Sequence, residues 1–570
     1  MKLSKNYATS RFRSILIVST FSLIVEYIVL LSHSIIVGWL LGSQALAALG
    51  IVTPLFSLII FVAFIITNGT VVLSNFAVGR QDRDEANRFF SQGVILSISA
   101  SIILTLVLYI FQQNIVSLFD VSPEIRGFVM EYFSVFLFLP IFQLFSTLLY
   151  CTVINEGGER LCTIASIVQI VTSIGVAIVL CAKIGIAGCA VAFLVTNFLS
   201  VLILCYHFLQ KHCQVSFQWY ISLKSVFSVL RYGAGDSMSF LYITVFATVM
   251  NIFLAARFGD TALIVFSVLL NFQTLMITGL DGIGQAIQPL VSVYYGENNL
   301  HGIKKTMRVA FAFTMIEGLT IMLLVLGFAS YIPSVFGITE PGIVKQTAFA
   351  LRVYSLSAVF WGVQMLLVTY FMYTAKLWLC HIISLALMLV CPLLLCLIVP
   401  AQWGLGAIWI AMALSILPAT ALSLLLIKNK SKKCTFPLLL ERDELDRQFS
   451  CDGLANAQGV NDIMNKAEAE MLSRGIEQKT IYKVLLMIEE VSMLSIEKSG
   501  RKDFYIECTL MFDENISLIL RDSGTYLDST EDVAPYSMEE YMRRTIVSAQ
   551  KNKKFAMSGG DNRTVFVFEK

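Results

Sequence analysis

Charge is scarce in this sequence of 570 residues. Only 14% of the residues are Asp, Glu, Lys or Arg, whereas a soluble chain typically carries about 25%. Hydrophobic residues make up 57% of the chain, and the mean hydropathy is +0.76. These values exclude an ordinary soluble protein and indicate a membrane protein.

Clustered charge and clustered cysteine are missing as well. The net charge is +2 and no acidic or basic tail dominates, so nothing indicates a nucleic-acid partner. The 12 cysteines are scattered, with no Cys-x-x-Cys pair and no Cys/His spacing typical of zinc sites. We interpret them as small hydrophobic residues of helices and predict no metal site.

Long apolar runs fill the first three quarters of the chain. A helix needs about 20 apolar residues to span a bilayer, and we predict twelve such helices. Their approximate bounds are 15–38, 46–78, 91–111, 128–150, 161–181, 185–209, 226–256, 263–293, 309–330, 347–372, 377–399 and 404–427. Lys and Arg are far more frequent at both ends and in the links that follow the even-numbered helices than in the links that follow the odd-numbered ones. Because cytoplasmic segments are enriched in Lys and Arg, this bias predicts that both termini are cytoplasmic.

A charged break between two apolar runs occurs twice. FAVGRQDRDEANR (76–88) returns 217 residues later as VYYGENNLHGIKK (293–305), so that Gly79 aligns with Gly296. A register that holds over most of both halves indicates a duplication, with six helices in residues 1–217 and six in 218–430. Because six is even, both copies cross the membrane in the same direction. Two such lobes, rocking on each other, are typical of a secondary transporter.

Several stretches then indicate a family. LLGSQALAALGIVTPL (40–55), the helix that ends in VGRQDRDEANR, and GIGQAIQPLVSVYYG (282–296) resemble the multidrug and toxic compound extrusion (MATE) transporters. The resemblance covers about residues 12–428. It implies a V-shaped antiporter of twelve helices that exports organic compounds and takes in protons or sodium ions. Related branches of the same superfamily carry lipid-linked sugars.

Ionisable residues inside a span are candidates for ion coupling. Glu26 and His33 lie seven residues apart in the first span and therefore share a helix face. The MATE family often has an acid where this chain reads LSHSIIVG (31–38), so His33 replaces that acid. We predict that Glu26 and His33 take part in coupling. The alternative is a hydrogen-bonded structural pair.

The eighth span adds further polar residues. Asp281 lies among glycines in ITGLDGIGQ (277–285), where a bend could free backbone carbonyls. Gln285 is the repeat counterpart of Asn68, and Gln288 follows one turn later. We predict that Asp281, Asn68, Gln285 and Gln288 line the cleft, whereas hydrogen bonding between helices is the alternative role of the amides.

The composition becomes polar after about residue 428. We assign 431–454 to a basic linker and 455–570 to a small cytoplasmic α/β sandwich. Its predicted elements are helices at 457–474 and 475–500, paired strands at 505–512 and 516–524, and a final strand at 562–569. This pattern resembles the GHKL ATPases, closest to the anti-sigma-factor serine kinases of bacteria.

The residues of an ATPase site are only partly kept. IEEVSML (488–494) retains Glu489 and Glu490, but Leu494 stands at the position of the magnesium-binding Asn of the GHKL family. Leucine cannot ligate magnesium, which needs oxygen ligands. RDSGTYLD (521–528) keeps Asp522 and Gly524, whereas the lid segment 535–547 has no glycine. We therefore expect a degenerate domain that does not turn over ATP and requires no cofactor.

Three functions compete at this point. The first is an antiporter in a bacterial plasma membrane that exports organic compounds, including cationic ones, and is driven by Na⁺ or H⁺. In this function the tail is regulatory and binds a cytoplasmic protein. The second is a flippase for a lipid-linked precursor. The third is a membrane-tethered signalling kinase, against which Leu494 argues. The duplicated bundle favours the first, and we expect no enzyme activity.

Overall fold

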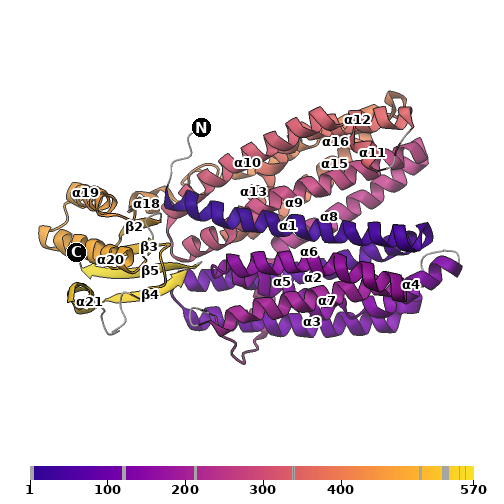
Figure 1. Ribbon diagram of the computed structural model, residues 1–570. Helices are drawn as coiled ribbons and strands as arrows, with labels where there is room; N and C mark the ends of the chain where they lie inside the picture. Colours follow the sequence, from indigo (N-terminus) through magenta and orange to yellow (C-terminus); the bar gives the residue numbers. More distant parts are fainter. Residues whose placement is uncertain are drawn as a thin grey trace.

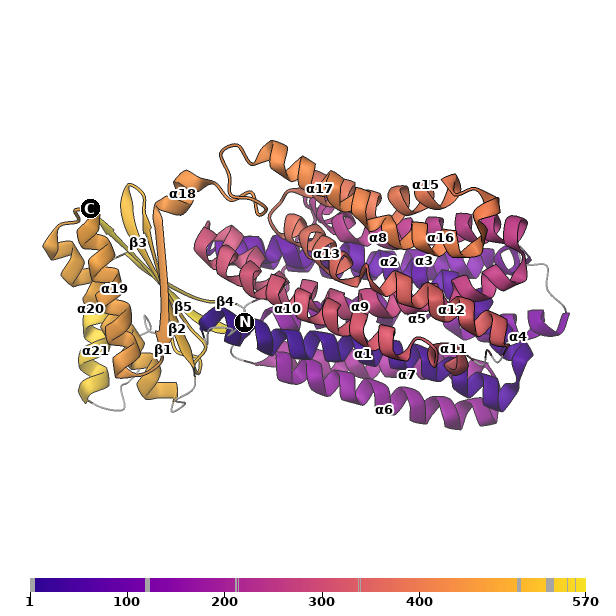
Figure 2. The same cartoon turned by 90° about the horizontal axis from the view of Figure 1, so that it is seen from above.

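The computed structural model describes residues 6–117, 123–210, 213, 215–336, 338, 340–499, 504–528, 538–550, 552–558 and 560–569. A long helical bundle lies beside a small domain built on a sheet (Figure 1). We call residues 442–569 the tail domain, and the end of the bundle that meets it the tail end. The first described residues, from residue 6 onward, also lie at the tail end (Figures 1 and 2).

Helices account for the whole bundle. They are α1 (Tyr7–Leu41), α2 (Ser43–Gly79), α3 (Arg83–Ser117), α4 (Pro123–Phe136), α5 (Leu139–Asn155), α6 (Glu159–Ile184), α7 (Ala187–Cys205), η1 (Tyr206–Leu209), α8 (Leu223–Phe258), α9 (Asp260–Gly296), α10 (Leu300–Phe328), α11 (Ile332–Val335), α12 (Pro341–Ser355), α13 (Ala358–Tyr373), α14 (Leu377–Leu385), η2 (Ala386–Val390), α15 (Cys391–Ile398), η3 (Ala401–Trp403), α16 (Gly404–Leu414) and α17 (Ile416–Lys430).

Among the described residues, ten helices are long and apolar enough to cross a membrane, or up to twelve if each bent pair counts as one span. The bent pairs are α4 with α5, at 51°, and α12 with α13, at 50°. The fourth and tenth predicted spans are therefore not continuous helices. In the first pair, Pro140 occupies the first turn of α5, where its missing N–H is tolerated, whereas it would interrupt a continuous helix.

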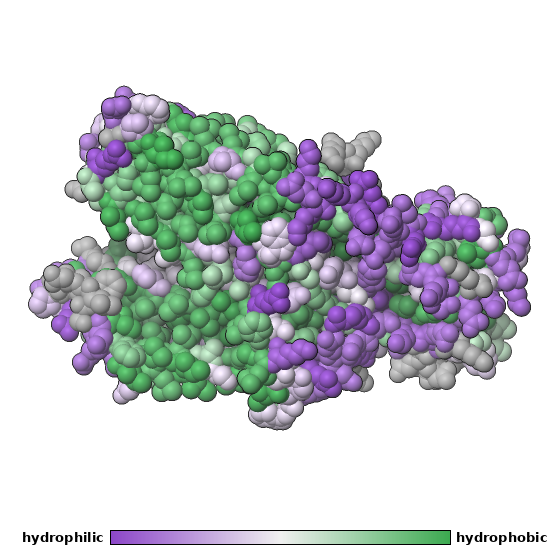
Figure 3. All heavy atoms as spheres, turned by 180° about the vertical axis from the view of Figure 1, so that it is seen from behind, coloured by the Kyte–Doolittle hydropathy of each residue, from purple (hydrophilic) through white to green (hydrophobic). Residues whose placement is uncertain are grey.

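The bundle has two halves with separate cores. We call α1–α7 the first bundle and α8–α17 the second bundle. Away from the tail end, each bundle packs its own apolar core, and the two cores share no residue. At the tail end a single core draws on both bundles, from Phe12 and Leu73 to Ile287 and Tyr370. The two apolar masses accordingly part toward the end far from the tail domain (Figure 3).

The bundles approach each other closely at two places, α2 against α8, where a Cβ on Gly233 would lie 1.7 Å from the carbonyl oxygen of Ile65, and the tail ends of α2 and α9. A Cβ atom built on Gly79 would lie 2.4 Å from the carbonyl oxygen of Val293, and one on Gly296 would lie 2.4 Å from that of Phe76. Nearby, the Asn75 amide donates to Ser292 Oγ at 2.8 Å, a pair separated by 217 residues. Only glycine at 79 and 296 allows the two backbones to touch in this way.

The tail domain is a sheet of five strands covered on one face by helices. The strands are β1 (Gln448–Leu454), β2 (Tyr505–Phe512), β3 (Asn515–Asp522), β4 (Lys553–Ser558) and β5 (Asp561–Glu569), in the order β1-β2-β3-β5-β4 with every neighbouring pair antiparallel. The helices are α18 (Arg442–Asp446), α19 (Ala457–Ser473), α20 (Gln478–Ser499) and α21 (Met538–Ala549).

The three strands predicted from alternation are present, but two others were not predicted. The predicted linker 431–454 is wrong at its end, because β1 pairs with β2 from Gln448 to Leu454. Strand β4 lies in the stretch after the predicted lid. Both are edge strands, which need only one pairing partner and carry a weaker alternation signal.

The two faces of the sheet have opposite character. Leu510, Leu518 and Phe566 lie in one row and pack into the apolar core with α19 and α20. The other face carries polar residues and lies against the tail end of the bundle, so that the sheet stands between its helices and the bundle (Figure 2). A five-stranded sheet is thus buried on both sides.

Candidate functional site: a polar chamber in the first bundle

A polar chamber of about 60 Å³ lies inside the first bundle, around Glu26 of α1. Most of its polar lining comes from α5, α6 and α7, and α9 of the second bundle adds one residue. The lining residues are Ser22, Leu23, Glu26, Phe64, Gln143, Ser146, Thr147, Tyr150, Cys151, Gln169, Asn197, Ser200 and Gln285. A cavity of this size and polarity can hold water molecules or a small cation.

Glu26 is the acid of this chamber. Its side chain is half-buried, and none of the described residues donates a hydrogen bond to its carboxylate. A carboxylate with no cation beside it, in a span, takes up a proton or a cation more readily than a paired one. The chamber can therefore load and release a positive charge.

His33 lies apart from the chamber, although it shares a face of α1 with Glu26. It is buried, its Nε2 atom is 2.6 Å from Ser173 Oγ, and its ring meets Phe193 edge-on with centroids 4.1 Å apart. These contacts fit a packed side chain. Asn68 is also buried, and it lines neither of the two polar cavities of the first bundle.

The three predicted site residues of α9 do not all lie at the chamber. Gln285 lines the same chamber as Glu26, and it is the lining residue that the second bundle contributes. Asp281 is half-buried one turn earlier, within electrostatic range of the Cys151 thiol of the chamber wall, as is Glu26. Gln288 points to a different place, where its carbonyl oxygen accepts from the Asn155 amide at 3.4 Å.

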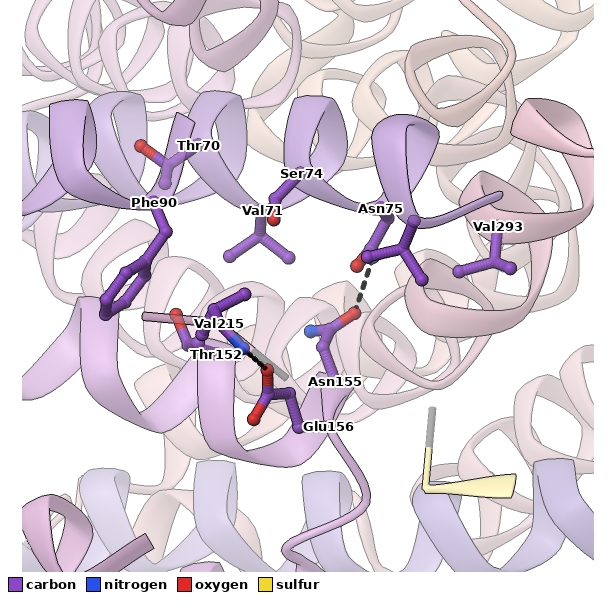
Figure 4. Close-up of a pocket in the computed structure, with 11 residues that line it drawn as sticks. Thr70, Val71, Ser74, Asn75, Phe90, Thr152, Asn155, Glu156, Val215 and Val293 are labelled. Atoms are coloured by element: carbon purple, nitrogen blue, oxygen red, sulfur yellow. Dashed lines mark hydrogen bonds between the residues drawn. The ribbon is translucent and has the colours of Figure 1, made fainter. Parts of the chain in front are cut away.

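A second polar cavity, of about 30 Å³, lies closer to the tail end and was not predicted (Figure 4). Asn75 of α2 and Asn155 of α5 meet at its edge, with Nδ2 of Asn75 donating to Oδ1 of Asn155 at 2.7 Å. Asn75 also reaches Ser292 of α9. The sequence signal for this network is weak, because Asn75 and Asn155 are two of several amides in largely apolar helices.

Three residues with metal-binding side chains converge beside this cavity. Glu156 Oε2 is 2.7 Å from His207 Nε2 and 3.4 Å from Cys213 Sγ, and Glu156 Oε1 accepts from the Val215 amide at 2.9 Å. Burial and the Glu156 carboxylate raise the pKa of the Cys213 thiol to about 12. The three side chains could ligate zinc, but their mutual hydrogen bonds already account for the cluster. Sequence spacing could not reveal it, because 51 and 57 residues separate the partners of Glu156 from it.

The predicted nucleotide residues of the tail domain are engaged with protein groups. Glu490 accepts from Arg543 of α21 at 3.0 Å, whereas Glu489 is exposed. Asp522 accepts from the Asn562 amide and from the Gly524 N–H, each at 2.9 Å, and burial raises its pKa. Leu494 is buried in the apolar core. Residues 535–537 of the predicted lid lie outside the described residues.

Comparison with known proteins places the bundle. A model of the MatE family matches residues 19–181 and 237–398. The solved structures that resemble the chain include a MOP superfamily transporter from Pyrococcus furiosus (TM-score 0.69, 20% identity, covering 76% of this chain and 100% of that one) and the Vibrio cholerae MATE transporter VcmN in its bent form (0.67, 18%, 73% and 95%). Another is an outward-facing multidrug resistance transporter (0.68, 20%, 75% and 98%). The comparison with curated proteins finds no match.

Proposed function

Because this chain belongs to the MatE family of membrane transporters, we propose that it is a secondary active antiporter that exports organic compounds, cations among them, in exchange for protons or sodium ions. A transporter of this family is not an enzyme. The observation that supports coupling to a cation is the carboxylate of Glu26, which lies in a polar chamber and has no hydrogen-bond or ion-pair partner among the described residues.

The proposal includes twelve spans in two repeats. Helices α2 and α9 are both 37 residues long and begin and end 217 residues apart, and the family model matches one stretch in each half. Each bent pair then serves as one span. Two bundles with separate cores and one shared end can rock about that end, which is the motion that alternating access requires.

We place the tail end on the cytoplasmic side of a bacterial plasma membrane, with both termini there. The excess of Lys and Arg at this end supports that orientation. In this arrangement the bundles are closed toward the cytoplasm and part toward the outside. The tail domain, a degenerate relative of GHKL ATPases in this proposal, is then a regulatory module that could also bind a cytoplasmic protein. No observation favours a lipid-linked precursor as substrate.

The experiment that tests transport uses the full-length chain in proteoliposomes, with ethidium as the probe and an imposed pH or sodium gradient. We expect one of the two gradients to drive ethidium movement, and Glu26→Gln to reduce that movement at least tenfold, because the amide cannot bind a cation by charge. Glu317→Gln, which removes an acid of α10 outside the chamber, is the matched control and should transport normally.

Two results would contradict the proposal. If neither gradient drives movement of the probe, the proposal of an antiporter for organic cations loses its support. Full gradient-driven transport by Glu26→Gln would show that the chamber does not couple the ion. The gradient that succeeds identifies the coupling ion.

A further inference from the structure

The polar face of the tail sheet carries a row of four charges. Asp452 of β1, Glu507 of β2, Arg521 of β3 and Arg563 of β5 are direct neighbours in the strand register. Glu507 is 2% exposed, and Arg521 and Arg563 are 3% to 4% exposed. Charged side chains are almost never this buried unless they are paired. Arg521 and Glu507 pair with each other at 3.5 Å, and the other partners of the row lie on the bundle.

The second bundle supplies the first set of partners. Glu297, directly after α9, accepts from Arg521, and its Oε1 atom forms an ion pair with Nε of Arg563 at 3.0 Å. The guanidinium of Arg521 also lies 4.5 Å from the ring centre of Tyr294, whose hydroxyl donates to Glu507 at 2.9 Å.

Further along the same edge, the start of α10 meets β1 of the tail domain. Lys305 Nζ lies 3.1 Å from Asp452 Oδ1. Gln448 joins the loop before α10 by two hydrogen bonds, one from the Leu300 amide at 2.9 Å and one to the Asn298 carbonyl at 2.6 Å. The second bundle is therefore held through β1, β2 and β3.

The first bundle binds the same sheet through β5. Asp561 accepts from the Tyr7 hydroxyl and lies 3.1 Å from Nε of Arg11, both on α1. Arg11 in turn pairs with Glu159 of α6 at 2.7 Å. The turn before β5 lies against the end of α5, since a Cβ on Gly560 would be 2.7 Å from the Cα of Gly157.

Arg563 contacts both the first and the second bundle. Its Nη1 and Nη2 atoms donate to the carbonyls of Val78 and Gly79, at 3.3 Å and 3.1 Å, while its Nε pairs with Glu297. The carbonyls at the end of a helix have no partner within the helix and carry partial negative charge. One guanidinium thus binds the end of α2 and the end of α9, directly over the glycines at which these helices touch.

We propose that the tail domain is a clamp on the two bundles, and that the tail ends of α2 and α9 can separate only after Arg563 releases at least one of them. A sheet held to both bundles by buried charges cannot follow two bodies that move apart. The regulation of transport by this clamp rests on the proposed function, because opening at this end would admit substrate from the cytoplasm. The clamp itself does not depend on what is transported.

The experiment measures hydrogen exchange by mass spectrometry on the full-length chain in nanodiscs, without any substrate. Arg563→Ala should accelerate exchange at least tenfold at the tail ends of α2 and α9, residues 76–80 and 293–297, because it leaves Glu297 short of a partner and frees the α2 carbonyls. Arg563→Lys keeps the positive charge but lacks the planar guanidinium that contacts several groups at once, and it should give an intermediate acceleration.

Arg543→Ala is the matched control. It removes an arginine of the same domain that pairs with Glu490 and Glu497 in α20, and it should leave exchange at the two helix ends unchanged. Protection of the β2 and β3 amides reports whether the tail domain remains folded in each variant. Unchanged exchange at the helix ends in both Arg563 variants, with a folded tail domain, would overturn the clamp. Failure of ethidium transport would leave this result untouched.

Discussion

At the scale of single residues, the contact between tail domain and bundle depends on charges removed from water. Asp561 is the clearest case. Burial raises its pKa to about 6, because this effect is larger than the opposing effects of Arg11 and of the Tyr7 hydroxyl. Arg521 and Glu159 also lie within electrostatic range. In a released tail the same carboxyl would titrate near its ordinary value of 3.8. Docking and protonation of Asp561 are therefore linked.

The linkage predicts a pH dependence of docking. A pKa that is higher in the docked state favours docking fully below about pH 4, and this contribution is lost as the pH rises through about 6. Acidification from pH 7 to pH 5 should therefore favour docking by about tenfold. The measurement is the protection factor of the β5 amides over this pH range. Asp561→Asn should abolish the dependence, and an equally steep profile in that variant would assign the proton to another group.

At the scale of elements, the meeting of α2 and α9 is limited by two glycines. Gly296→Ala would place a methyl group 2.4 Å from the Phe76 carbonyl oxygen, which belongs to the backbone and cannot rotate away. We expect the two helix ends to be forced apart, at a cost of about 1–3 kcal/mol, seen as a lower midpoint of thermal unfolding.

Gly175→Ala is the matched control within α6. A Cβ at Gly175 meets nothing within 4 Å, so alanine should leave the protein as stable or slightly more stable, as its helix propensity predicts. An equal fall of the midpoint in both variants would mean that the close approach of α2 and α9 is not what limits position 296.

The elements also show what the sequence could and could not predict. Apolar run length and alternation depend on neighbours in the chain, which is why the strand at 505–512 was placed within its observed bounds. The pairing of Arg563 with Glu297 depends on the docking of two folded units, and no local pattern encodes that. Glu26 could be singled out because an acid in an apolar run is costly, whereas the partners of its chamber came from five other helices.

At the scale of the whole molecule, the tail domain has become part of the transporter's architecture. The sheet is buried between its own helices and the bundle. The carboxylate of Glu490 already pairs with Arg543, and the side chain of Leu494 provides no metal ligand. We therefore expect that titration calorimetry of the full-length chain with ATP, with and without magnesium, detects no micromolar binding. Micromolar binding that Asp522→Asn abolishes would instead make the tail domain a nucleotide sensor.

The connection between the two units is short and partly fixed. Helix α17 ends at Lys430 and β1 begins at Gln448, and Leu438, Leu439 and Leu440 between them are buried in the core shared by both bundles. A released tail domain would therefore remain tethered within a few tens of ångströms of its docking surface, at an effective concentration in the millimolar range. Reclosure would be a unimolecular step, independent of how many copies the membrane holds. A soluble competitor for this surface would need to exceed that local concentration, or bind far more tightly, to keep the two bundles apart.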